Sequence, residues 1–144
     1  MTETDKIIEI LGGAQFVGKE PHQKQSLIAS VQRGFRFDTL LFLKALYELP
    51  DEVAQKIIAV SSRTWARRKA EDRLSPVESD RLHRLARIIA RTEEVFGSRE
   101  KSRLWIKEPN RALQLQTPLS LLDTDEGTRR VEDVLIRIEH GVFS

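Results

Sequence analysis

Side chains suited to DNA contact cluster in one short stretch of this 144-residue chain. The planar fork of arginine can bond O6 and N7 of guanine together, whereas Ser, Thr and Lys suit phosphate oxygens. The stretch holds seven such side chains: Ser61, Ser62, Arg63, Thr64, Arg67, Arg68 and Lys69. On charge alone, a helix face that is simply solvated explains this cluster about as well as DNA contact does.

Residues that could catalyse a reaction or hold a metal do not form a pattern. His22, His83 and His140 are far apart and lack acidic partners at metal-ligand spacing, so we expect surface or hydrogen-bonded histidines. The glycine-containing stretch 12–18 lacks the lysine-serine/threonine ending of a P-loop and the spacing of a Rossmann loop. The sequence therefore predicts no enzyme activity, no metal site and no cofactor.

Composition and charge narrow the class of protein. The chain has no cysteine, which fits a reducing cytoplasm, and no signal-type segment or membrane-length apolar run. We expect a soluble cytoplasmic protein with no membrane partner. Bases outnumber acids by three in 61–74, and acids outnumber bases by three in 121–140. This division of charge along the chain predicts one surface that binds an anionic polymer and another that binds a different partner.

Helical patterns run throughout the chain, so we predict an all-α fold. Helices are expected over 5–11, 26–32 (capped by Ser26) and 37–49, with a loop over 16–25. A helix opening at Pro50 and a helix capped by Ser61 or Ser62 form a helix-turn-helix. Trp65 should point inward, against Ile57 and Ile58.

A strong helix start follows at Ser75-Pro76-Val77-Glu78, where serine can cap and glutamate can bond back. That helix should end at Gly97, and Ser98 should start another. Turn signals lie at Pro109-Asn110 and Thr117-Pro118, and an amphipathic helix should run from about Asp125 to Gly141. We expect an N-terminal helical extension over 1–33, a helix-turn-helix region over 34–74 and a third region over 75–144.

Two stretches of the chain resemble a known family. The last third resembles the toxin-binding domain of Xre/MbcA/ParS antitoxins, through these spaced residues: Leu104-Trp105, Pro109-Asn110, Leu113, Thr117-Pro118, Leu122, Gly127, Val131 and His140-Gly141-Val142. The stretch 63–69 is similar to the Arg-Thr-Leu-x-Arg-Arg-Lys signature of Xre-type antitoxins, with Trp65 replacing leucine. The chain departs from the family pattern at Gln55, usually a small residue, at Ala59, usually glycine, and at Gln114-Leu115, often a glycine pair.

The resemblance implies an Xre/Cro-like helix-turn-helix bundle followed by a helical toxin-binding domain. It implies an antitoxin that occludes the active site of an NAD-consuming toxin, most often one with a RES domain, and represses its own operon. Partners would be the toxin, operator DNA and a second copy in a dimer or higher oligomer. The implied toxin contacts are Arg129, Arg130, Arg137, Gly141, Val142, Phe143 and Ser144.

Two other functions remain open from the sequence. The chain could be a plain helix-turn-helix transcriptional regulator whose C-terminal region only dimerises. It could also be a protein-interaction module that has lost DNA binding, given Gln55 and Ala59. Most apolar residues of the last third are expected to be ordinary core: Trp105, Leu113, Leu119, Leu122, Val131, Leu135 and Ile138.

Overall fold

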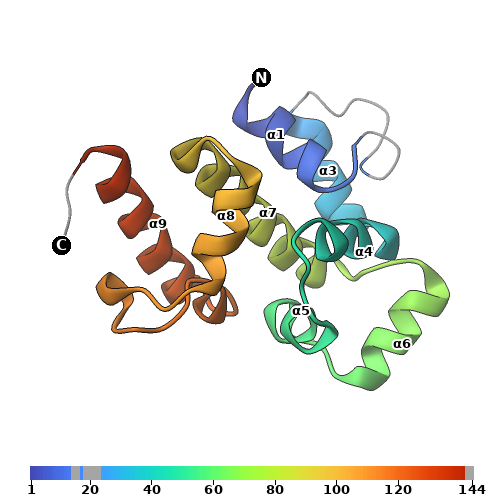
Figure 1. The fold of residues 1–144 in the computed structure, drawn as a ribbon. Coiled ribbons are helices and arrows are strands. Elements are labelled where there is room, and N and C mark those ends of the chain that lie inside the picture. The colour runs from blue at the N-terminus through green and yellow to red at the C-terminus, as the bar shows by residue number, and fades with distance from the viewer. Residues whose placement is uncertain (14–16, 18–23, 142–144) are drawn as a thin grey trace. The chain divides into compact units, whose positions relative to one another are not determined.

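The fold is all-α, as the sequence predicts. A computed structural model describes residues 1–13, 17 and 24–141. The described residues form helices joined by turns, and their one β-type pairing is an isolated bridge between Asn110 and Gln116 (Figure 1). None of the helices in these ranges is both long and apolar enough to cross a bilayer.

The chain folds as two compact units, Met1–Arg87 and Ile88–Ser144. Helix α7 (Pro76–Phe96) contributes to both. Its predicted start is confirmed: the Glu78 backbone N–H donates to Ser75 Oγ at 3.1 Å, and Ser75 N–H donates to Glu78 Oε1 at 3.0 Å. The expected division into 1–33, 34–74 and 75–144 stays a prediction.

Besides the first part of α7, the described residues of unit 1 include the helices α1 (Glu3–Ile10), α3 (Lys24–Arg33), α4 (Phe37–Leu46), α5 (Asp51–Ile58) and α6 (Ser62–Glu71). The start expected for α3 was wrong, because the chain is already helical at Lys24 and Ser26 lies within the helix. Helix α4 ends three residues earlier than expected, since Glu48 adopts a left-handed φ of 53° and Leu49 precedes a proline. The loop expected over 16–25 lies mostly outside the described residues.

Helix α4 is central to the core of unit 1. Phe37, Leu40 and Leu43 are fully buried, together with Phe35 before the helix and Tyr47 after it. Burying such side chains contributes about 1.5–3 kcal/mol each to folding. These side chains provide the surface on which α6 of the helix-turn-helix packs.

A hydrogen-bonded junction joins the start of α4 to the segment between α6 and α7. Leu74 N–H donates to the Phe35 carbonyl at 2.8 Å, and Phe35 N–H donates to Ser79 Oγ at 2.8 Å. Gly34, at φ 96°, allows this approach, because an added Cβ would lie 2.3 Å from the Leu74 carbonyl oxygen. The junction holds the C-terminal end of α6 in place.

Unit 2 contains the rest of α7, followed by α8 (Arg99–Lys107), two short 3-10 helices, η1 (Arg111–Leu113) and η2 (Leu119–Leu121), and α9 (Asp125–Glu139). The predicted starts at Ser98 and near Asp125 are confirmed, and side-chain oxygens of Ser98, Asn110 and Thr124 accept from backbone N–H groups two or three residues ahead. Helix α9 packs on η1 and η2. Gly127 allows that contact, because an added Cβ would lie 2.0 Å from the Leu121 carbonyl oxygen.

The core of unit 2 contains most of the apolar residues expected there. Leu113, Leu119, Leu122, Val131 and Leu135 are buried. Trp105 and Ile138 are only half-buried, so for these two the core assignment was too strong. Trp105 packs on Phe96 with ring centroids 5.4 Å apart.

Candidate functional site

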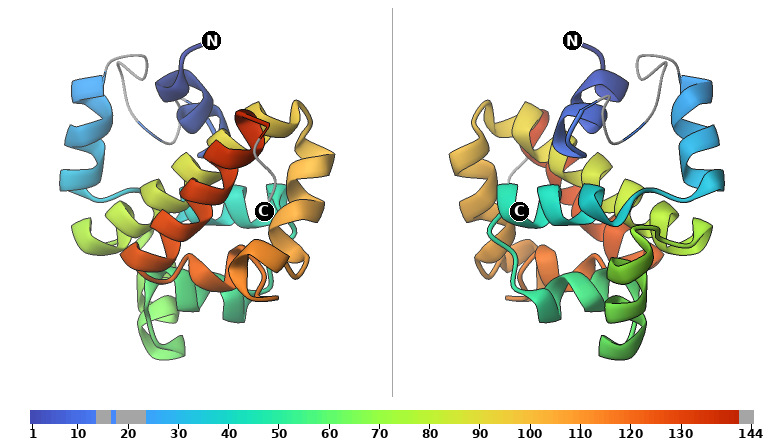
Figure 2. Two further views of the ribbon diagram at one scale, coloured as in Figure 1. Left: turned by 90° about the vertical axis from the view of Figure 1, so that its left-hand side faces the viewer. Right: turned by 90° about the vertical axis from the view of Figure 1, so that its right-hand side faces the viewer.

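The turn between α5 and α6 has the helix-turn-helix form that the sequence predicts (Figure 2). Ala59 caps α5 in the left-handed conformation, at φ 58° and ψ 55°, and Ser61 caps α6 by accepting from Thr64 N–H at 3.1 Å. The Gln55 carboxamide oxygen accepts from Ser62 Oγ at 3.3 Å. Both departures from the family pattern, Gln55 and Ala59, are therefore accommodated within a two-helix turn.

Helix α6 presents Trp65 to the core and arginines to the outside. Trp65 is buried and packs edge to face on Phe37 of α4, with centroids 5.0 Å apart and planes at 84°. This confirms its inward orientation. Arg63 and Arg67 lie two residues before and after Trp65, which places them on the opposite, exposed face. Neither guanidinium forms a hydrogen bond or ion pair with the described part of the chain.

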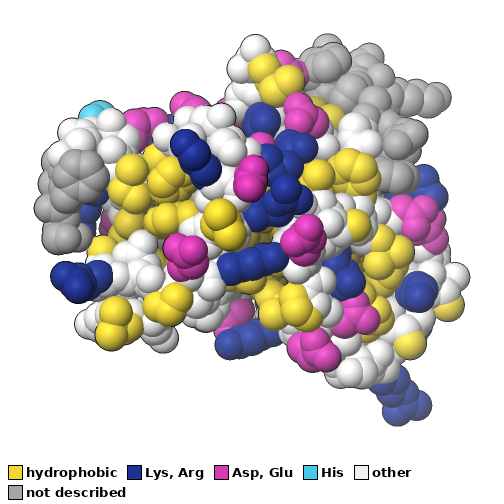
Figure 3. Space-filling model, in the orientation of Figure 1, with side chains coloured by type: hydrophobic (Ala, Val, Ile, Leu, Met, Phe, Trp, Pro, Cys, Tyr) yellow, Lys and Arg dark blue, Asp and Glu magenta, His cyan; other side chains and the backbone are white. Residues whose placement is uncertain are grey.

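The other small polar and basic candidates surround this face. Ser61, Ser62 and Lys69 are exposed, and the half-buried Thr64 shares a hydroxyl–hydroxyl contact of 3.2 Å with Ser61. Lys and Arg side chains lie on the surface over α6, at the lower right of the space-filling view (Figure 3). The N-terminal end of α6 thus carries donors for phosphate oxygens beside two free arginines.

Arg68 has different surroundings from Arg63 and Arg67. Its Nε and Nη2 donate to Glu78 Oε1 and Oε2 at 2.8 and 3.1 Å, an interaction with two parallel hydrogen bonds. Burial alone would raise the pKa of Glu78, but hydrogen bonds from Arg68 and Ser75 outweigh it and hold that pKa below its usual value. Arg68 therefore connects α6 to the start of α7.

The second candidate surface is a polar groove in unit 2. Its volume is about 280 Å³, and it lies between the η1–η2 segment and α9. Arg130 and Arg137 line it, whereas Arg129 does not and instead pairs with Asp125 at 3.1 Å. Gly141 follows α9 at φ 72°. The other expected toxin contacts, Val142, Phe143 and Ser144, lie outside the described residues.

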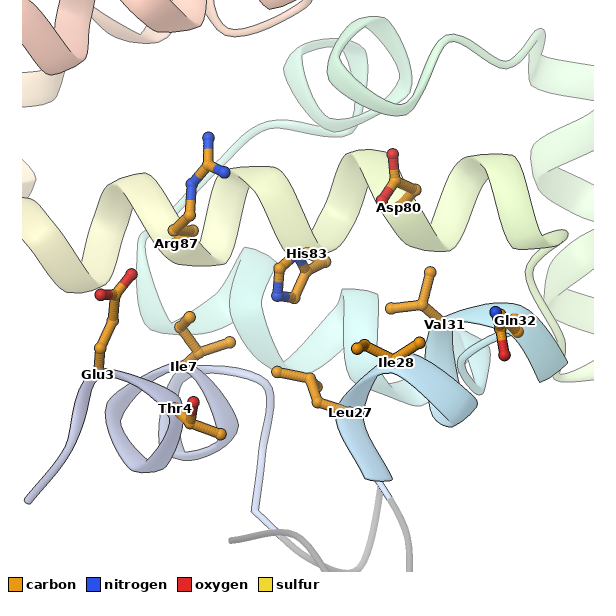
Figure 4. Close-up of a pocket in the computed structure, with 10 residues that line it drawn as sticks. All are labelled: Glu3, Thr4, Ile7, Leu27, Ile28, Val31, Gln32, Asp80, His83 and Arg87. Carbon is orange, nitrogen blue, oxygen red and sulfur yellow. The ribbon is translucent and has the colours of Figure 1, made fainter. Parts of the chain in front are cut away.

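A second cavity, in unit 1, was not predicted from the sequence. It has a volume of about 540 Å³ between α1, α3 and α7, and His83 points into it beside Ile7 and Leu27 (Figure 4). His83 is half-buried and makes no hydrogen bond with the described residues. Burial, together with the nearby Arg87, lowers the pKa of His83, against the opposite influence of Asp80 and Glu3. No local motif marks this cavity, because three separate helices form it.

Within the described ranges, no three His, Cys, Asp or Glu side chains are grouped closely enough to hold a metal ion. His83 and His140 belong to different units, and His22 lies outside the described residues.

Comparison with known proteins assigns a family to each unit. Residues 26–87 match the family described as the antitoxin Xre-like helix-turn-helix domain, which falls within unit 1. Residues 91–141 match the family described as the antitoxin Xre/MbcA/ParS C-terminal toxin-binding domain, which falls within unit 2. The two matches thus coincide with the arginine face of α6 and with the groove beside α9.

Relatives named "Antitoxin Xre" match this chain over stretches of different length. The one from Yersinia enterocolitica is 32% identical over 120 residues, which cover 82% of this chain and 81% of the relative. The one from Photorhabdus laumondii is 34% identical over 91 residues, 62% of each chain. The one from Pseudomonas putida is 42% identical over 64 residues, 44% of this chain and 40% of the relative. The chain therefore belongs to the Xre antitoxin family and combines an Xre-like helix-turn-helix domain with a C-terminal toxin-binding domain.

Proposed function

We propose that this chain neutralises an NAD-consuming toxin of the RES-domain kind by covering its active-site entrance, and that it represses its own operon through α6. The observation that carries the proposal is the coincidence of a toxin-binding family match with the unit that holds the α9 groove. Inhibition by occlusion needs no chemistry from this chain, only a surface that excludes substrate. The class of toxin rests on the family resemblance of the C-terminal region.

The proposed toxin contacts are arginines of α9 and the residues that follow it. Arg129, Arg130 and Arg137 are exposed along α9, and their guanidinium groups can form paired hydrogen bonds with carboxylates. Gly141, Val142, Phe143 and Ser144 come directly after this helix, where they would fill the toxin's pocket entrance. A few buried anchors commonly dominate such an interface.

The experiment is NAD consumption by the purified product of the adjacent gene, titrated with this chain. We expect inhibition at equimolar amounts of the unaltered chain. Removing residues 141–144 should raise the concentration needed for half-inhibition by about tenfold or more, as expected for loss of a binding anchor. Full inhibition by the shortened chain would refute the role of these residues. No NAD consumption, or no inhibition by the unaltered chain, would favour a plain transcriptional regulator.

The proposed DNA contact places the N-terminal turns of α6 in the major groove. Arg63 and Arg67 would read bases, and Ser61, Ser62, Thr64 and Lys69 would bind phosphates. Arg68 was included among the expected DNA contacts, but its pairing with Glu78 supports a bracing role instead. A homodimer or higher oligomer would place two copies of α6 one DNA turn apart on a palindrome.

The test is the affinity for the chain's own promoter DNA, measured by fluorescence anisotropy over a series of salt concentrations. Arg63→Ala and Arg67→Ala should each weaken binding by about tenfold, in line with the roughly 1–3 kcal/mol of a good base contact. Arg129→Ala is the matched control, since it removes an exposed arginine from unit 2 and should leave DNA affinity unchanged. Unaltered binding by both α6 variants would show that α6 does not read DNA.

A further inference from the structure

One loop of unit 2 holds a leucine in solvent with a backbone conformation that leucine rarely adopts. Leu115 has φ 66° and is 69% exposed, and the preceding Gln114 has φ 57°. The left-handed region strains any residue that carries a Cβ, and it favours glycine. Burial does not offset this strain, because most of the Leu115 side chain contacts solvent.

Several of the hydrogen bonds that fix the loop involve Asn110. Leu115 N–H donates to the Asn110 carbonyl at 2.8 Å, and Asn110 N–H donates to the Gln116 carbonyl at 3.0 Å. Asn110 Oδ1 also accepts from Ala112 N–H at 2.9 Å. These hydrogen bonds therefore hold the strained backbone in one conformation, which keeps Leu115 at one position. Local strain that the surrounding structure enforces is typical of binding sites.

The groove beside α9 adjoins this leucine. Gln114 and Gln116, the neighbours of Leu115 on either side, both line it, as do Arg130 and Arg137. Arg137 is exposed and has no ion pair with the described residues. Arg130 has only a loose contact of 3.8 Å with Glu126, and its side chain is 64% exposed. The loop that carries this exposed aliphatic side chain thus helps to form a groove that also contains two arginines available to a partner.

We propose that Leu115 is an anchor for the toxin: its side chain enters an apolar recess on the toxin surface, and Arg130 and Arg137 pair with carboxylates beside that recess. This inference rests on the proposed function and adds the chemistry of the partner surface. Burial of the leucine removes apolar area from water, and the surrounding contacts exclude water from the arginine–carboxylate pairs. Toxin binding would then explain why leucine, and not glycine, occupies this left-handed position, which folding alone does not explain.

The experiment measures affinity for the immobilised product of the adjacent gene by biolayer interferometry. Leu115→Gly removes the side chain and supplies a residue suited to φ 66°, so the variant should fold at least as stably as the unaltered chain. We expect its affinity to fall about tenfold or more, with a urea midpoint that is equal or higher. Leu115→Met keeps an apolar side chain and should bind nearly as well as leucine. Arg137→Gln should also weaken binding.

The matched control is Glu48→Gly, which makes the same kind of change at a left-handed φ of 53° but in unit 1. It should bind the toxin like the unaltered chain. Equal toxin affinity of Leu115→Gly and the unaltered chain would overturn the anchor. So would dissociation of a homo-oligomer by Leu115→Gly with toxin affinity intact, since the occupant would then be a second copy. Absence of binding by the unaltered chain would instead overturn the proposed function itself.

Discussion

Ala59 occupies the left-handed position of the turn between α5 and α6, with φ 58°. A residue with a Cβ is strained by about 1–2 kcal/mol in this region, and glycine avoids that strain. Part of this gain in stability is lost, because glycine gives the unfolded chain more conformational freedom. Ala59→Gly should therefore raise the free energy of unfolding by up to about 1 kcal/mol in urea titration. Ala66→Gly, at an exposed interior position of α6, is the control and should lower it by about 1 kcal/mol. A loss of stability in Ala59→Gly would contradict the strain at this turn.

His83 should make the stability of unit 1 depend on pH. Its pKa is lower in the folded protein than in the unfolded chain, mainly because of burial, so the unfolded chain binds the proton more readily. The free energy of unfolding should fall as the pH drops below the ordinary histidine pKa of about 6.5. His83→Gln should reduce that dependence, measured by urea titration at several pH values. His140→Gln, an exposed histidine in unit 2, should leave it in place. Identical pH profiles for all three proteins would refute the role of His83.

At the scale of elements, the Arg68–Glu78 pair links α6, the helix proposed to read DNA, to the start of α7. Glu78→Gln removes the charged partner of Arg68 and should lower the free energy of unfolding by about 2 kcal/mol, the value of hydrogen bonds to a charged group. Promoter affinity should fall by a similar factor in Glu78→Gln and Arg68→Ala, and the double variant should resemble either one. A far larger loss of DNA affinity in Arg68→Ala would show that Arg68 contacts DNA directly.

The packing of α9 on η2 depends on the absence of a side chain at Gly127. In Gly127→Ala the new Cβ would lie 2.0 Å from the Leu121 carbonyl oxygen, so one of the two elements must shift. We expect a loss of about 1–3 kcal/mol in the stability of unit 2, as in other overpacked contacts, and weaker toxin inhibition. Gly97→Ala, where a Cβ would meet nothing within 4 Å, should cost only the strain of its left-handed φ. Equal effects of the two substitutions would contradict the close approach.

Local signals explain what the sequence could predict about these elements. Capping by Ser61, Ser75 and Thr124 depends on residues three positions away, so the starts of α6, α7 and α9 were predicted correctly. The early end of α4 was missed because nothing in the residue type of Glu48 marks a left-handed φ.

Contacts between distant residues explain what the sequence could not predict. Arg68 was grouped with Arg63 and Arg67 because its partner, Glu78, lies on the next helix. The cavity around His83 requires α1, α3 and α7 together, and residues 1–33 carry no motif. For unit 2, the sequence placed Arg130 and Arg137 on one helix, but only the fold places them beside Gln114 and Gln116.

At the scale of the whole molecule, the two candidate surfaces belong to different units. The arginine face of α6 lies in unit 1, and the groove with Leu115 lies in unit 2. Substitutions of exposed side chains on one unit should therefore leave the function of the other nearly intact, since sites that share no partner residues are usually independent. The separation allows toxin neutralisation and DNA binding to be tested independently in one protein.

The most direct test of the account is growth and cellular NAD after induction of the adjacent gene, with this chain co-expressed. Induction alone should deplete NAD and arrest growth. Co-expression of the unaltered chain should restore both, and so should the Arg63→Ala, Arg67→Ala double variant, because the proposed toxin contacts lie in unit 2 and these two arginines lie in unit 1. Toxicity that the unaltered chain cannot relieve, or an adjacent gene that is harmless when induced, would contradict the account and leave this chain as a DNA-binding regulator.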